Sequence, residues 1–137
     1  MNRVPSNEKK KDNYSKEVLI SREEINRRVE QLGREISQDY KGRELHLVGV
    51  LNGAFMFIAD LARHLSIPCQ ICFLQASSYK DQLVSTGKVK LMHNLDLSGK
   101  DVLVVEDIFD TGLTLKHIME DLYVQKPTSL EICALLN

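Results

Sequence analysis

Residues 102–114 read VLVVEDIFDTGLT, and this stretch decides how the rest of the chain is interpreted. Its four leading apolar residues predict a strand buried on both faces, which is typical of parallel sheets. Two carboxylates follow at once, and a third leads a Thr-Gly-x-Thr turn that opens a helical pattern. A buried strand that delivers acids to a glycine-containing turn and a helix start favours binding of a phosphorylated sugar.

Helices and strands are predicted to alternate along the rest of the chain. Ser21 and Glu24 form a capping box, which predicts a helix from there to about Asp39. Strands are expected at 45–51, 69–76, 102–107 and 130–136, a return strand at 89–93, and further helices around 55–65 and 115–122. This alternation predicts a doubly wound, mostly parallel α/β sheet with helices on both faces. Because ligands bind beyond the carboxyl ends of such strands, the segments after 51 and after 105 are expected to face one crevice.

Composition limits the classes of function. A chain of 137 residues with a net charge of −1 is one domain by length and gives no electrostatic reason to expect nucleic acid as a partner. Its sequence contains no apolar run of membrane-spanning length, so no membrane is expected and a cytoplasmic location is predicted. Residues 1–16 are polar and are expected to form a disordered tail ahead of a domain at 17–137.

The cysteines and aromatic residues are interpreted as structural. Cys69 and Cys72 form a C-x-x-C pair, but residues three apart on a strand face opposite sides, so neither a zinc site nor a redox pair is expected. Together with Cys133 they are predicted to be buried thiols. Phe55 and Phe57 are expected to lie in the core.

The chemistry of the turn comes from its residue types. Thr111, Gly112, Leu113 and Thr114 would present backbone N–H groups and hydroxyls to a phosphate at a helix N-terminus. The turn lacks the lysine of the G-x-x-x-x-G-K phosphate loop. Carboxylates beside a phosphate repel it unless sugar hydroxyls or a cation intervene. Glu106, Asp107 and Asp110 therefore imply a ribose phosphate together with Mg2+.

These residues resemble the signature of the type I phosphoribosyltransferases, the enzymes that use phosphoribosyl pyrophosphate. The match is a hydrophobic strand, Glu106-Asp107, two apolar residues, then Asp110-Thr111-Gly112-x-Thr114. Within the family the chain looks most like the hypoxanthine-guanine phosphoribosyltransferases. Segments 48–55 and 77–90 resemble that group's pyrophosphate loop and flexible loop.

The resemblance implies a role for each matching position. Glu106 and Asp107 would hold the ribose hydroxyls directly or through Mg2+, and Asp110 would act as the base near the purine. Residues 110–114 would wrap the 5′-phosphate, while Leu51, Asn52 and Gly53 would contact pyrophosphate across a cis Leu51–Asn52 peptide. The lid would carry Ser78 and Tyr79. The implied partners are phosphoribosyl pyrophosphate, a purine base and the nucleotide IMP or GMP.

Two departures from the family pattern are visible. Asn52 stands where the pyrophosphate loop often has lysine or arginine, which removes a charge from that position. The family's base-recognition segment follows the strand that ends here near Leu136, so the C-terminal hood is expected to be incomplete. A missing final strand would leave a sheet edge exposed, which favours a homo-oligomer, a dimer or tetramer.

Two alternatives remain open at this point. A non-catalytic or regulatory binder on the same fold would keep residues 106–114 but lack a base pocket. A receiver-like signalling domain also ends an apolar strand in paired acids. In that class, however, the acid pair normally follows the first strand, and the Thr-Gly-x-Thr turn has no place.

Overall fold

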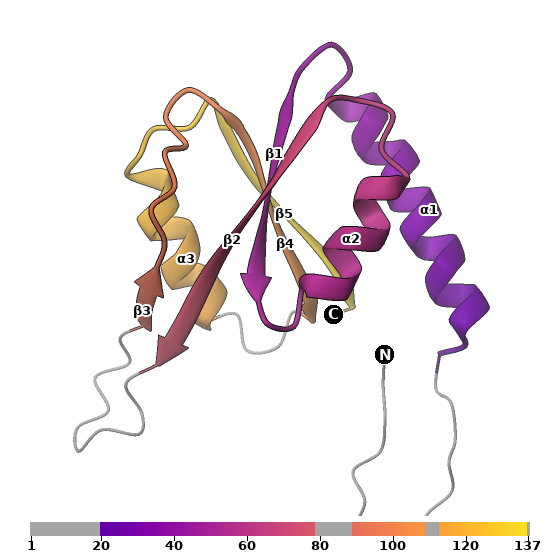
Figure 1. Cartoon of the computed structure of the whole chain (residues 1–137), viewed down its shortest axis with the longest axis horizontal. Helices are drawn as coiled ribbons and strands as arrows, with labels where there is room; N and C mark the ends of the chain where they lie inside the picture. The colour runs from indigo at the N-terminus through magenta and orange to yellow at the C-terminus, as the bar shows by residue number, and fades with distance from the viewer. Residues whose placement is uncertain (1–19, 79–88, 109–112, 137) are drawn as a thin grey trace, which may run out of the picture.

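The computed structural model describes residues 20–78, 89–108 and 113–136. Its helices and strands alternate as predicted (Figure 1), in the order α1 (Arg22–Asp39), β1 (Leu45–Leu51), α2 (Phe55–Arg63), β2 (Cys69–Ser78), β3 (Val89–Met92), β4 (Asp101–Ile108), α3 (Leu113–Tyr123) and β5 (Ser129–Leu136). The predicted disordered tail at 1–16 lies outside the described residues, so that division of the chain stays a prediction.

The five strands form one sheet in the order β3-β2-β1-β4-β5. Parallel pairing joins β2, β1, β4 and β5, and only β3 runs antiparallel, against β2. Along the chain, β2 and β3 are added on one side of β1. The strand β4 then pairs with the other side of β1, and β5 pairs with β4. The predicted doubly wound, mostly parallel sheet is confirmed, and its strand order reverses between β1 and β4.

Helices cover both faces of this sheet. In Figure 1, α1 and α2 lie on one face and α3 on the other. Alternate residues of β1 divide between the two cores: Leu45 and Leu47 pack with α1 and α2, whereas Val48 and Val50 pack with α3. The central strands are buried on both faces, which explains the uninterrupted apolar run at 102–105.

The start of α1 is set by the predicted capping box. The N–H of Glu24 donates to Ser21 Oγ at 3.1 Å, and the N–H of Ser21 donates back to Glu24 Oε1 at 3.4 Å. These bonds satisfy N–H groups that have no partner within the first turn.

In the described part of the chain, no helix combines the length and apolar character needed to cross a membrane.

Several local predictions need correction. The strand β2 extends through Ser78, because Ser77 and Ser78 pair with Lys90 and Val89 of β3 instead of opening a loop. Phe55 is 55% exposed rather than in the core, although Phe57 is buried as predicted. Phe55 is the first residue of α2, where it contacts the ring of Phe73 beside the sheet.

The cysteines confirm one expectation and modify another. Cys69 packs with the α1 and α2 core and Cys72 with the α3 core, so the pair does face opposite sides. Only Cys133 is fully buried, whereas Cys69 and Cys72 are half-buried, so the prediction of buried thiols is confirmed for one of the three. All three thiols are free.

Candidate active site

The candidate site lies where β1 and β4 end side by side. Their register pairs Gly49 with Val105, so the turn that follows Leu51 comes level with Glu106 and Asp107. Both strands run in the same direction, and their carboxyl ends therefore reach the same edge of the sheet. The alternation of strands and helices predicted that both segments face one crevice, but not that β1 and β4 are neighbours.

The turn after β1 packs directly against an acid at the end of β4. A Cβ atom built on Gly53 would lie 2.8 Å from Asp107 Oδ1 and 3.1 Å from Asp107 Oδ2. Backbone hydrogen bonds from Ala54 N–H to Val50 O (3.1 Å) and from Phe55 N–H to Asn52 O (3.2 Å) hold the turn at the start of α2. The Leu51–Asn52 peptide is cis, as the family resemblance implied. The turn at 51–53, which is expected to contact pyrophosphate, thus meets Asp107, which is expected to hold ribose hydroxyls. Their meeting point at the carboxyl edge of the sheet is called the corner below.

Glu106 and Asp107 form an interacting pair of acids. The N–H of Asp107 donates to Glu106 Oε1 at 3.2 Å. Burial raises the pKa of Glu106 to about 7, and a hydrogen bond from the side chain of Asp107 and the negative charge of that residue push this pKa in the same direction, against the opposing effect of the Asp107 N–H. The side chains of β4 alternate between the two faces of the sheet from Val102 to Val105. At the end of this strand, however, the carboxyl groups of Glu106 and Asp107 interact with each other. Two adjacent acids, of which Glu106 is harder to ionise than an ordinary glutamate, are suited to a cation or to hydroxyl donors.

Other predicted site residues are placed only in part. Leu113 and Thr114 form the first turn of α3, and Ser78 is the last residue of β2. Tyr79, Asp110, Thr111 and Gly112 lie outside the described residues. In residues 20–78, 89–108 and 113–136, no group of three or more potential metal ligands comes together, so Glu106 and Asp107 alone represent the predicted metal site there.

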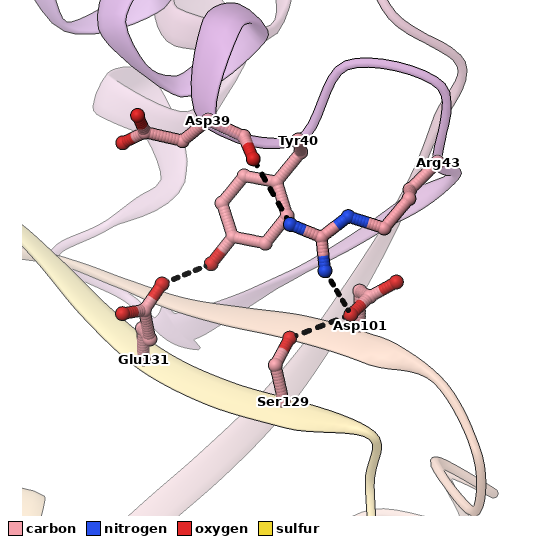
Figure 2. A network of polar contacts seen from close by, with 6 residues as sticks. All are labelled: Asp39, Tyr40, Arg43, Asp101, Ser129 and Glu131. Carbon is pink, nitrogen blue, oxygen red and sulfur yellow. Dashed lines mark hydrogen bonds and ion pairs between the residues drawn. The ribbon is translucent and has the colours of Figure 1, made fainter.

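A second polar cluster, which the sequence did not predict, lies at the opposite edge of the sheet (Figure 2). The hydroxyl of Tyr40 donates to Glu131 of β5. Arg43 pairs with Asp101 of β4 at 3.0 Å, and Ser129 Oγ donates to the same Asp101 oxygen at 2.7 Å. This amino-edge network ties the end of α1 to the beginnings of β4 and β5.

Contacts within the network explain its geometry. The guanidinium of Arg43 lies 4.8 Å from the centre of the Tyr40 ring and also donates to Asp39 O at 2.9 Å. Tyr40 is 3% exposed, and burial followed by the hydrogen bond to Glu131 raises the pKa of its hydroxyl. Local sequence patterns do not predict this network, because the partners on β4 and β5 are distant along the chain.

Comparisons with known proteins cover nearly the whole chain. Residues 7–137 match the phosphoribosyl transferase domain family. A hypoxanthine phosphoribosyltransferase from Salmonella typhimurium is 46% identical over 128 residues, and a hypoxanthine-guanine phosphoribosyltransferase from Dictyostelium discoideum is 45% identical over 129. Each alignment covers 90% of this chain and 72% of the relative. A crystal structure of a hypoxanthine-guanine phosphoribosyltransferase from Bacillus anthracis superimposes with a TM-score of 0.81 at 41% identity, covering 88% of this chain and 73% of that one.

Proposed function

Because this chain belongs to the phosphoribosyltransferase family, we propose that it moves a 5-phosphoribosyl group from phosphoribosyl pyrophosphate to hypoxanthine or guanine. The products would be IMP or GMP and pyrophosphate, the chemistry of purine salvage. The relatives reported above are named as enzymes, which favours this function over a non-catalytic binder. The observation that carries the proposal is the contact between the turn at Gly53 and the carboxylate of Asp107.

Each part of the substrate is assigned to one part of the corner. We assign pyrophosphate to Leu51, Asn52 and Gly53, and the ribose hydroxyls to Glu106 and Asp107. Residues 110–114 would enclose the 5′-phosphate at the start of α3, where backbone N–H groups and the helix dipole favour an anion. Asp110 would accept the proton of the purine, and Ser78 and Tyr79 would close over the reacting carbon to keep water out.

The donor set also suits Mg2+. Carboxylate oxygens are the ligands that this ion prefers, and Glu106 and Asp107 supply them side by side. Burial, followed by the side-chain hydrogen bond and the charge of Asp107, raises the pKa of Glu106, and a bound cation would favour its ionised form. When bound, Mg2+ would neutralise charge on the departing pyrophosphate.

Carboxylates near the sugar suit the expected transition state. Pyrophosphate leaves the ribose C1 while a purine nitrogen attacks, so positive charge develops on the sugar as in glycoside chemistry. The negative charge of Glu106 and Asp107 would stabilise that charge. Exclusion of water matters because water would otherwise hydrolyse the activated sugar.

We also propose that the protein forms a homo-oligomer, a dimer or tetramer, and that it works in the cytoplasm. The ring pair of Phe55 and Phe73 and the exposed Ile71 on the same strand give an apolar surface on α2 and β2. Among the described residues, β5 pairs only with β4 and leaves its other edge open. Analytical ultracentrifugation tests the assembly: a monomer at micromolar concentration would contradict it.

Nucleotide formation tests the main proposal. The assay supplies phosphoribosyl pyrophosphate, Mg2+ and hypoxanthine, guanine or xanthine. It is run on this chain and on a version extended by the C-terminal segment of the Salmonella relative, since the chain spans 72% of that protein. IMP or GMP should form with at least one version. If neither version makes a nucleotide from any purine, the proposed function is wrong.

A further inference from the structure

Gly53 is not required by the conformation of its own backbone. Among the described glycines, only Gly42 and Gly99 have a positive φ, at 82° and 71°. Gly53 lies outside that region, so an alanine can adopt its φ without the strain that a left-handed residue would have. Another reason must explain why position 53 carries no side chain.

That reason is the space occupied by one carboxylate. The three atoms nearest to a Cβ at position 53 are Oδ1, Oδ2 and Cγ of Asp107, at 2.8, 3.1 and 3.2 Å. The glycines at 33 and 49 are also crowded, but by the Cβ and backbone of His64 and by the side chains of Phe73 and Ile58. Gly53 is therefore the described glycine whose missing side chain makes room for an acid.

The consequence of filling that space falls on the position of Asp107. Its carboxylate is the far end of a side chain, so rotation of that side chain, without a shift of the backbone, relieves the clash. It also forms a side-chain hydrogen bond with Glu106, so a displaced carboxylate changes the arrangement of both acids. An alanine at position 53 would thus leave the protein folded while moving the acid that faces the turn.

We propose that Gly53 is a positioning residue that acts through Asp107. By keeping position 53 empty, it allows the carboxylate to lie against the turn at 51–53, so that the pyrophosphate turn and the ribose acids work as one unit. This inference rests on the proposed function, because it concerns the binding of phosphoribosyl pyrophosphate with Mg2+. It adds to the direct contact with pyrophosphate that the family resemblance implied for Gly53.

A double-mutant cycle with Gly53→Ala and Asp107→Ala tests this coupling. Isothermal titration calorimetry measures the Kd of phosphoribosyl pyrophosphate in the presence of Mg2+ for the wild type, both single variants and the double variant. Gly53→Ala should raise this Kd about tenfold, the order of effect expected from weakening one hydrogen bond to a charged group. In the Asp107→Ala background the same change should alter the Kd less than about twofold, because there is no carboxylate to displace.

Thermal unfolding and steady-state kinetics separate positioning from loss of structure. Gly53→Ala should keep the melting temperature of the wild type and raise KM for phosphoribosyl pyrophosphate more than it lowers kcat. Gly33→Ala is the matched control: its Cβ would meet backbone of His64, so it should lower the melting temperature without changing the Kd of the folded protein. An equal effect of Gly53→Ala with and without Asp107 would overturn the inference, as would no effect at all. A wild type that fails to bind phosphoribosyl pyrophosphate would instead refute the proposed function.

Discussion

Acids lie at both edges of the sheet, but their surroundings differ. At the amino edge, Asp101 is paired with Arg43 and accepts a hydrogen bond from Ser129. At the carboxyl edge, Glu106 lies beside another acid, and burial and that neighbour raise its pKa to about 7. An acid with a cation and a hydroxyl beside it is suited to stabilise the fold, whereas two adjacent acids, one of them with a raised pKa, are suited to bind a cation or sugar hydroxyls. The amino edge is accordingly interpreted as structural and the carboxyl edge as functional.

The largest expected effect concerns chemistry at the carboxyl edge. Asp110→Asn should lower kcat by about 10²- to 10⁴-fold, the usual contribution of a general base, because an amide cannot accept the purine proton. Binding of phosphoribosyl pyrophosphate should remain close to that of the wild type in calorimetry. If binding is lost together with turnover, Asp110 has a structural or ligand-holding role instead.

A change at the amino edge should affect stability and leave substrate binding intact. Tyr40→Phe removes a nearly buried hydroxyl that donates to a carboxylate, and should lower the free energy of unfolding by about 1–2 kcal/mol in urea titrations. Tyr123→Phe is the control, since Tyr123 is 72% exposed and its loss should change stability by less than about 0.5 kcal/mol. A changed KM for phosphoribosyl pyrophosphate in Tyr40→Phe would weaken the separation between the two edges.

The paired acids at the carboxyl edge should make stability depend on pH. The pKa of Glu106 is raised from 4.5 to about 7 in the folded chain, so the folded form holds this proton more tightly. Wild-type stability should therefore fall as pH rises from about 4.5 through 7, where the unfolded chain has already lost the proton. Without Mg2+ at pH 8, Glu106→Gln should be more stable by about 1 kcal/mol, a value reduced for partial solvent exposure, and the difference should vanish at pH 4. Equal unfolding free energies of the two proteins at pH 8 would argue against a raised pKa of Glu106 in the folded chain.

The smallest effects are expected from the C-x-x-C pair, which belongs to neither edge cluster. Cys69→Ala and Cys72→Ala should each reduce stability by less than about 1 kcal/mol, because both thiols are half-buried and face opposite cores. Activity should not change with dithiothreitol or with added zinc. Activity that responds to a reductant would point to a redox role that the geometry does not support.

Local patterns predicted the elements well because each depends on residues close in sequence. The capping box at Ser21 predicted the start of α1, and the apolar run at 102–105 predicted a strand buried on both faces. The prediction of a core position for Phe55 was wrong because periodicity identifies the apolar stripe of a helix, but not how much of that stripe the sheet covers. Cys69 and Cys72 were predicted too deep for the same reason.

Contacts between distant segments were beyond the reach of such patterns. The approach of Asp107 to Gly53 depends on β4 lying next to β1, and no local feature specifies which strands become neighbours. The bonds from Tyr40 and Arg43 to β5 and β4 depend on the same strand order. Local patterns also gave no sign that His46 is buried, at 6% exposed, with an Nδ1 that has no hydrogen-bond partner among the described residues.

The reversal of strand order between β1 and β4 also bears on how the protein is made. The segments that meet at Gly53 and Asp107 are separated by about fifty residues. Bringing them together closes a long loop, and the chain loses conformational entropy before the contacts of the corner can stabilise it. During synthesis, α1, β1, α2 and β2 leave the ribosome before β4, and they can pair while the corner is still missing. Substrate binding is thus expected to appear after the first half of the sheet has formed, which makes ligand capture on a stalled nascent chain a measure of when the sheet is completed.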